Sequence, residues 1–349
     1  MDAVNLKSYF FYLATSVIII AGLKAAGEIV IILFLAIFIA SIISSLLIFL
    51  QKGKVPKFIS YIIVLSIILI FILLMYYIIN ISLKDFLNNL NSYQDGLNNL
   101  IAGSISFVEQ YGYKVDRSQI TEALNLNSFF GFTTGIIGNI GSFLSKFLLI
   151  IIGIAFILAE SKSFENKLKI IFKSDVQKLK HFNLFSHNIQ KYFVVKSTTS
   201  FLTGFIITVI LVYFKVDYPI LWGVLAMVFN FVPVVGSIIA AIPAVILSLL
   251  NADINTTIIL IVLYLTINIS ISNIIEPKLM GKELGLSPLI IFFSLILWGW
   301  VLGIVGMFLA VPITMTLKIA FNTNRSTYWI AILMSDLSKG RKKNKDRGF

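Results

Sequence analysis

The stretch that decides the fold is residues 288–318, PLIIFFSLILWGWVLGIVGMFLAVPITMTLK. It runs for 30 residues before its first charge, whereas a single helix needs only about 20 apolar residues to cross a bilayer. Four helix-breaking residues interrupt or follow its middle: Gly299, Gly303, Gly306 and Pro312. A helix that is too long and is broken at mid-length is typical of a hairpin inside a membrane protein.

A second stretch, residues 219–250, has the same character: PILWGVLAMVFNFVPVVGSIIAAIPAVILSLL. Three residues break it at mid-length: Asn230, Pro233 and Gly236. Two interrupted apolar segments in one half of a chain indicate a transport site between them.

The composition predicts an all-α, polytopic integral membrane protein. The chain has 349 residues, of which 58% are hydrophobic and 13% are charged, and its mean hydropathy is +0.96. Soluble domains carry about 25% charged residues. The apolar spans are far longer than the roughly 10 residues of a barrel strand, so we expect helices.

The charges lie in three basic segments, which predicts the orientation in the membrane. The net charge of +12 is concentrated in residues 51–57, 161–196 and 321–349. Basic loops face the cytoplasm, so we expect both termini there, with the lysines of 161–196 reaching the lipid phosphates of the inner leaflet. The positive charge is therefore explained by membrane orientation and contact with lipid headgroups. This argues against a nucleic-acid partner.

About eight hydrophobic segments are expected, two of them broken or re-entrant. The domains follow as: 1–83, N-terminal transmembrane helices; 84–130, an extracytoplasmic amphipathic helical insert; 131–160, a transmembrane helix; 161–196, a basic cytoplasmic interfacial segment; 197–320, the transport core; and 321–349, a basic cytoplasmic tail. The lysines of 276–287 stay inside if 219–250 is re-entrant and fall outside if it spans once. The charge rule favours re-entrant hairpins.

Polar residues within apolar runs are the candidates for the solute or ion path, because they are costly in lipid. The path candidates are Asn230, Pro233, Gly236, Asn268, Ser272, Asn273, Glu276, Trp298, Gly299, Gly303 and Gly306. Asn230 either binds a cation or solute or caps the broken helix. Helical spacing places Asn268, Ser272 and Glu276 on one face. Glu276 either binds sodium or a proton, or pairs with Lys278 or Lys282; Trp298 either lines a cavity or packs.

The residues give no indication of an enzyme or of a cofactor. The sequence has no cysteine and two histidines, both in a lysine-rich segment, so we expect no metal site. A Walker-type phosphate loop and a Ser/His/Asp arrangement are also missing from the sequence. Any energy source for transport is then an ion gradient, or there is none.

Residues 219–244, PILWGVLAMVFNFVPVVGSIIAAIPA, and 273–312, NIIEPKLMGKELGLSPLIIFFSLILWGWVLGIVGMFLAVP, resemble the autoinducer-2 exporter (AI-2E) family, also called PerM-type permeases. The order of three spans, an external insert and five more hydrophobic segments is similar too. The resemblance implies a homo-oligomeric protein of the bacterial inner membrane. It also marks five structural positions: Pro243, Pro277, Gly281, Pro288 and Pro312.

The resemblance leaves several functions open. Members are described as exporters of autoinducer-2, and others as sodium(lithium)/proton antiporters. We therefore expect a permease for efflux of a small polar solute such as autoinducer-2, with cation/proton antiport through Glu276 as the alternative. A third possibility is a membrane scaffold that uses the 84–130 insert for assembly.

Overall fold

The fold is all-α, as the composition predicts. The computed structural model describes residues 3–111, 131, 135, 146–171, 176–233, 235–251, 253–280, 285–323 and 326–336. Within these ranges the chain is almost wholly helical, and its β-pairing is limited to one isolated bridge between Leu286 and Ser335. Gly281 and Lys282 lie outside the described residues, as does most of the chain between α4 and α7.

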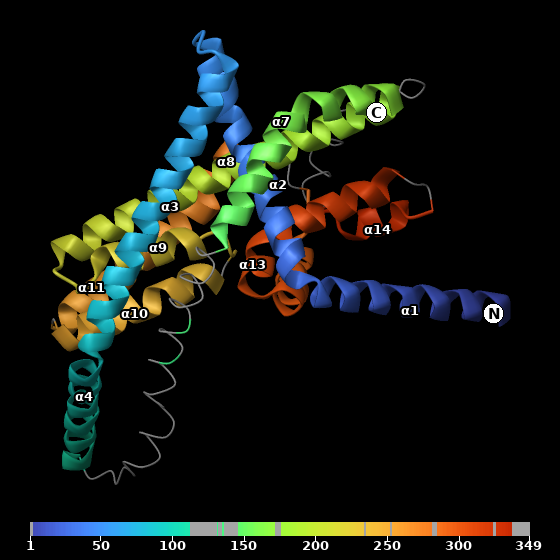
Figure 1. Cartoon of the computed structure of the whole chain (residues 1–349). Helices are drawn as coiled ribbons and strands as arrows, with labels where there is room; N and C mark the ends of the chain where they lie inside the picture. Colours follow the sequence, from blue (N-terminus) through green and yellow to red (C-terminus); the bar gives the residue numbers. More distant parts are fainter. Residues whose placement is uncertain are drawn as a thin grey trace, which may run out of the picture. The chain divides into compact units, whose positions relative to one another are not determined.

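Figure 1 shows the described helices in their order along the chain. Their bounds are α1 Ala3–Ala25, α2 Gly27–Lys52, α3 Lys57–Asn88, α4 Leu90–Gln110, α7 Phe147–Ile171, α8 Val176–Tyr213, α9 Pro219–Phe229, α10 Val235–Asn251, α11 Ile254–Ser270, the π-helix η1 Ile271–Ile275, α12 Glu276–Met280, α13 Pro288–Thr323 and α14 Tyr328–Leu333. The predicted amphipathic insert, 84–130, contains the end of α3 and the whole of α4, and its residues 112–130 are outside the described ranges.

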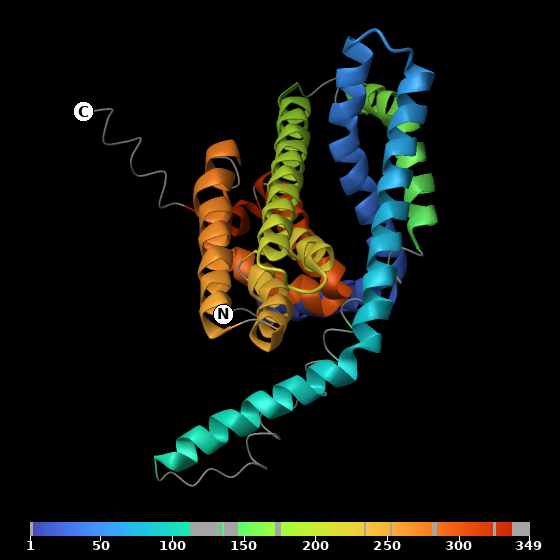
Figure 2. The ribbon, with the colours of Figure 1, turned by 90° about the vertical axis from the view of Figure 1, so that its left-hand side faces the viewer.

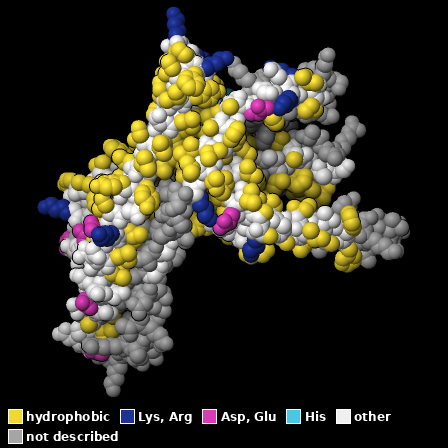
Figure 3. Space-filling view, in the orientation of Figure 1, with side chains coloured by type: hydrophobic (Ala, Val, Ile, Leu, Met, Phe, Trp, Pro, Cys, Tyr) yellow, Lys and Arg dark blue, Asp and Glu magenta, His cyan; other side chains and the backbone are white. Residues whose placement is uncertain are grey.

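The surface of the helices is that of a membrane protein. By length and composition, five described helical stretches can cross a bilayer: Gly27–Lys52, Lys57–Asn88, Ser186–Tyr213, Ile254–Met280 and Pro288–Asn322. Large apolar side chains such as Phe58 and Phe292 are exposed on them, and hydrophobic groups cover wide areas of the face in Figure 3. Such exposure favours lipid as the surrounding solvent. The prediction of a polytopic membrane protein is confirmed.

The chain forms two compact units. Unit 1 comprises 1–60, 148–195 and 277–349, and unit 2 comprises 61–147 and 196–276. Each unit contains one of the two broken apolar segments.

In unit 1, α13 is the second broken segment, and it folds back on itself. Gly303 has φ 66° and ψ −151°, which is not helical and is a conformation that glycine adopts readily. The indole nitrogen of Trp298 donates to the hydroxyl of Thr314 over 3.2 Å, although a straight helix would separate these residues by about 24 Å. We call α13 hairpin 2, with its tip at Gly303.

The tip of hairpin 2 packs against the N-terminal helices of unit 1. The Lys24 ammonium, near the end of α1, lies 3.9 Å from the centroid of the Trp300 ring. Gly27, at the start of α2, faces Leu302, and the ring of Phe38 in α2 meets Phe308 edge-on. Small and aromatic residues at the start of the chain therefore position a segment near its end.

In unit 2, α9 and α10 form the first broken segment, which we call hairpin 1. Its described turn residues are 230–233, and α10 packs against both α9 and α11. At the tip, a Cβ added to Gly236 would come within 1.8 Å of the carbonyl oxygen of Phe229, so only glycine fits there. The prediction of two broken apolar segments is confirmed.

Facing glycines bring α8 and α9 into close contact. A Cβ on Gly204 would lie 2.6 Å from the carbonyl oxygen of Gly223, and a Cβ on Gly223 would lie 2.8 Å from that of Gly204. Small residues allow helices in membranes to approach closely and to gain packing contacts. This contact sets hairpin 1 against α8.

The base of hairpin 1 is closed by a polar cluster around Asp217. Its carboxylate accepts hydrogen bonds from the Tyr93 hydroxyl of α4, at 2.8 Å, and from the Asn251 amide at the end of α10. Its backbone carbonyl accepts from the Trp222 indole at 2.8 Å. The same residues therefore join both ends of hairpin 1 and attach α4 to them. Figure 2 shows α4 continuing from α3 after a change of direction.

The glycine contact predicts a specific loss of stability. We expect Gly223→Ala to force α8 and α9 apart, because its Cβ would lie 1.8 Å from the Thr208 hydroxyl, and to lower the free energy of unfolding by about 1–3 kcal/mol. Gly103→Ala in α4 is the control, since nothing lies within 4 Å of its Cβ position. The melting temperature in detergent should fall for the first variant only. Equal melting temperatures would contradict the close contact.

The Tyr93 cluster predicts a pH dependence. Burial, followed by hydrogen bonds with Tyr218 and Asp217, raises the pKa of the Tyr93 phenol above its ordinary value of 10.0. The neutral phenol therefore stabilises the fold below pH 10, and this contribution is lost as the pH rises further, because the unfolded phenol ionises first. The stability difference between wild type and Tyr93→Phe should be constant near neutral pH and shrink above about pH 10.

Chemical unfolding across this pH range measures that difference. Tyr111→Phe, at an exposed position directly after α4, provides the control and should follow the wild-type profile. Parallel profiles for wild type and Tyr93→Phe would rule out a contribution from this hydrogen bond.

Candidate functional site

A stripe of polar residues runs along the buried face of α8. It consists of Lys196, Thr199, Ser200 and Thr203, which occupy positions i, i+3, i+4 and i+7 of the helix. None of the four is more than 4% exposed. They lie within the apolar stretch Ser186–Tyr213 that can cross a membrane. Polar groups at such a depth require partners within the protein.

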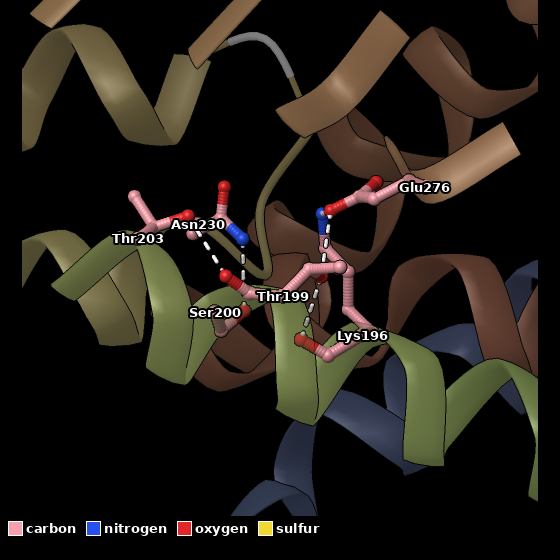
Figure 4. A network of polar contacts seen from close by, with 6 residues as sticks. All are labelled: Lys196, Thr199, Ser200, Thr203, Asn230 and Glu276. Atoms are coloured by element: carbon pink, nitrogen blue, oxygen red, sulfur yellow. Dashed lines mark hydrogen bonds and ion pairs between the residues drawn. The ribbon is translucent and has the colours of Figure 1, made fainter. Parts of the chain in front are cut away.

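Lys196 pairs with Glu276, which follows the π-helix η1. The ammonium lies 2.6 Å from Oε1 of the carboxylate, and the two side chains are 5% and 12% exposed. The Thr199 hydroxyl donates to the same oxygen over 3.0 Å (Figure 4). Removing one member of a buried ion pair typically costs about 3–5 kcal/mol, so this pair ties α8 firmly to the end of α11.

The π-helix explains where Glu276 points. One extra residue in a helical turn rotates everything after it by about 100°. Ser272 and Asn273 are exposed, whereas Glu276 turns toward α8. Asn268 is half-buried and donates to the Tyr264 carbonyl of its own helix over 2.8 Å. The structure therefore does not bring Asn268, Ser272 and Asn273 together with Glu276.

Asn230 lies at the tip of hairpin 1 and reaches the same stripe. It is 4% exposed, and its amide nitrogen donates to the Ser200 hydroxyl over 2.9 Å. Its side chain thus bridges to α8, while Pro233 and Gly236 complete the turn beside it. Figure 4 shows this bond next to the ion pair, with Thr203 donating to the Thr199 carbonyl.

These groups form two adjacent polar contacts along one face of α8, the ion pair with Thr199 and the bond between Asn230 and Ser200. Together these contacts, which we call the network, contain one carboxylate, one ammonium, three hydroxyls and one amide: Glu276, Lys196, Thr199, Ser200, Thr203 and Asn230. Such groups can hydrogen-bond a hydroxylated solute, and the carboxylate can attract a cation. Among the described residues, no group of three His, Cys, Asp or Glu side chains could hold a metal ion.

The remaining predicted residues belong to hairpin 2 in unit 1. Trp298 is buried, and its indole is held by Thr314. Gly299 packs against Met307, Gly303 is the exposed tip, and a Cβ on Gly306 would lie 1.9 Å from the Trp298 carbonyl oxygen. The structural prolines lie in α10, α12 and α13: Pro243, Pro277, Pro288 and Pro312.

The sequence analysis did not predict the residues that α8 contributes to the network. Lys196 was expected among the lysines that reach lipid phosphates; instead it is buried, because Glu276 neutralises it. The partners considered for Glu276 were Lys278, which is exposed, and Lys282. The signal that could have identified Lys196 is its helical spacing with Thr199, Ser200 and Thr203 on an apolar helix.

The sequence profile described as "AI-2E family transporter" matches residues 13–326. A putative transport protein of Haemophilus influenzae is 32% identical over 339 residues, which cover 95% of this chain and 97% of that protein. The AI-2 transport protein TqsA of Escherichia coli is 30% identical over 323 residues, covering 93% and 94%. A sodium-lithium/proton antiporter of Halobacillus andaensis is 24% identical over 247 residues, covering 70% and 68%.

These bacterial relatives are named as transport proteins, and two of them align over nearly their whole length. Together with the apolar helices, this makes the chain a multi-pass membrane transporter. It belongs to the AI-2E transporter family.

Proposed function

We propose that the protein is a secondary permease that exports a small polar solute, such as autoinducer-2, along a path through the network at the tip of hairpin 1. The observation that carries this proposal is the hydrogen bond between Asn230 and Ser200, buried inside an apolar unit. The family and the similarity to a relative named as an AI-2 transport protein support the choice of solute.

The chemistry of the tip suits an uncharged polar solute. An intramolecular hydrogen bond is worth only about 0.5–1.5 kcal/mol net, because it is exchanged for another. A solute hydroxyl can therefore replace Ser200 as the partner of Asn230 at little cost. The break in the helix after Phe229, at 230–233, leaves the tip as a separate element that can change partners. A group that binds and releases a solute needs both an exchangeable hydrogen bond and a segment that can change partners.

The orientation in the membrane is part of the proposal. The basic segments favour cytoplasmic termini, an inner-membrane location and two hairpins that re-enter the membrane. Homo-oligomers are expected from the family resemblance, and the lysines of 161–171 that are exposed on α7, Lys167 and Lys169, can contact anionic lipid.

The Asn230–Ser200 bond predicts a loss of transport. In liposomes loaded with autoinducer-2, we expect Asn230→Ala to slow efflux about tenfold, the equivalent of about 1.4 kcal/mol. Ser200→Ala should have a smaller effect in the same direction, because the amide can still reach a solute. Thr266→Val is the control, since this threonine is exposed and bonds only within α11. Unchanged efflux for Asn230→Ala in folded protein would refute the path.

A second candidate function is sodium(lithium)/proton antiport. The observation that favours it is a carboxylate buried with an ammonium in membrane-crossing helices, since such groups mark ion pathways. One relative carries the antiporter name.

Glu276→Gln separates the two functions. In vesicles with a sodium gradient and a pH-sensitive dye inside, this variant should abolish sodium-dependent proton movement if Glu276 is the carrier, yet leave part of the autoinducer-2 efflux. Because Lys196 would lose its partner, Lys196→Gln/Glu276→Gln restores neutrality and guards against misfolding. Glu160→Gln, at an exposed site, is the matched control. Full proton coupling in both Glu276 variants would eliminate Glu276 as the carrier.

A further inference from the structure

Tyr264 in α11 carries a buried hydroxyl whose bonding is incomplete. The residue is 3% exposed. Among the side chains of the described residues, one buried nitrogen or oxygen atom has no hydrogen-bond partner, and it is Oη of Tyr264. A buried tyrosine hydroxyl usually has a partner, and an unsatisfied one costs about 1–3 kcal/mol. A group kept at such a cost requires an explanation.

The buried face of α11 is directed at hairpin 1. Thr257, Leu260 and Tyr264 are all buried and occupy positions i, i+3 and i+7. At one end of this face, the Thr257 and Ser248 hydroxyls are 3.2 Å apart, which joins α11 to α10. Tyr264 therefore belongs to the stripe that packs on hairpin 1 and does not point to lipid.

The helical register places Tyr264 opposite small residues. The helices α10 and α11 are antiparallel neighbours joined by a short connection. Tyr264 lies seven residues after Thr257, about 10 Å along α11. Ala241 lies seven residues before Ser248 on α10, so it is level with Tyr264. Ala240 and Ala244 nearby are buried. These alanines offer the phenol neither a donor nor an acceptor.

Tyr264 is close to the tip of hairpin 1 along the same axis. Counted in the same register, Asn268 is level with Ser237, which follows Gly236 at the tip. Tyr264 is one helical turn further out, about 6 Å along the axis. A tyrosine one turn from the tip presents a ring face and one hydrogen-bond donor, a combination common in pockets for small ligands.

We propose that the Tyr264 hydroxyl is a further solute-binding group, which donates a hydrogen bond to a hydroxyl or carbonyl oxygen of the transported solute. This rests on the proposed function. It extends the path from Asn230, on the α8 side of hairpin 1, to the α11 side. The solute class is a small molecule with at least one oxygen acceptor beside an apolar surface.

The rival explanation is packing alone, and it makes the opposite prediction. If Tyr264 only filled space, phenylalanine would fill the same volume without a buried unsatisfied hydroxyl. Tyr264→Phe would then be equally or more stable and would transport as well as wild type. If the hydroxyl binds solute, the same variant is equally or more stable but binds solute more weakly. Transport distinguishes the two, and the stability measurement shows that the variant is folded.

The transport experiment uses autoinducer-2 efflux from proteoliposomes over a range of concentrations. We expect Tyr264→Phe to raise KM about tenfold, as for the loss of one hydrogen bond, while kcat changes less than about twofold. The melting temperature should not fall. Tyr213→Phe, at a position 79% exposed on α8, is the matched control and should keep the wild-type KM. An unchanged KM for Tyr264→Phe overturns the proposal.

A second experiment does not depend on the solute. Because the chain has no cysteine, Tyr264→Cys introduces a single thiol, and a small hydrophilic methanethiosulfonate reagent reports whether water reaches it. Leu260→Cys, one turn away and fully buried, is the control. We expect Tyr264→Cys to react at least about tenfold faster, since a thiol buried in apolar packing is inert.

The two experiments separate the two proposals. Labelling of Tyr264→Cys in a protein that exports no autoinducer-2 would make the proposed solute wrong and support a polar path at Tyr264. Autoinducer-2 export by wild type, with Tyr264→Cys reacting no faster than Leu260→Cys, would make the Tyr264 proposal wrong and leave the proposed function standing.

Discussion

The buried ion pair between Lys196 and Glu276 is the constraint on which the rest of unit 2 depends. Neither charge can remain in an apolar helix without a partner, and the loss of one would cost about 3–5 kcal/mol. The pair therefore fixes the end of α11 against α8, and Thr199 completes it. One turn along α8, Ser200 then lies where Asn230 can reach it. The ion pair in this way sets the frame in which the hairpin tip finds its partner.

The network contains two kinds of interaction that differ in how easily they can be exchanged. The bond between Asn230 and Ser200 is neutral, and a polar solute can replace it with little net change in free energy. The bond between Lys196 and Glu276 is charged, and opening it requires another charge in the same place. Passage of a neutral solute thus leaves the Lys196–Glu276 pair intact, whereas ion exchange at Glu276 must break this pair. This difference favours solute export over antiport as the proposed function.

The helical class and both broken segments could be predicted from the sequence, because the length and hydropathy of a segment can be read from its own residues. The sequence also singled out Asn230 and Glu276, since polar groups in apolar runs are conspicuous. It could not supply their partners, which lie 30 and 80 residues away. Lys196 resembled the neighbouring cytoplasmic lysines, and only its spacing with the polar residues of α8 distinguished it.

The face of α11 could not be predicted because helical periodicity was assumed to be regular. The positions i, i+4 and i+8 share a face only if every turn has 3.6 residues. The π-turn at Ile271–Ile275 breaks that rule immediately before Glu276. Ser272, within this turn, and Glu276, directly after it, consequently differ in exposure. Irregular turns of this kind recur at functional sites, which agrees with the position of Glu276 in the network.

The two hairpins solve the same folding problem but differ in chemistry. Each apolar run is too long for one crossing, and at each tip a glycine packs against a carbonyl: Gly236 against Phe229, and Gly306 against Trp298. The tip of hairpin 1 carries Asn230 and its bond to α8, whereas the tip of hairpin 2 is packed by apolar and aromatic groups. The two tips share this glycine–carbonyl contact but carry different side chains. The polar chemistry is therefore a property of hairpin 1 itself and does not follow from the turn. The path that we propose for a polar solute therefore has its hydrogen-bonding groups in unit 2.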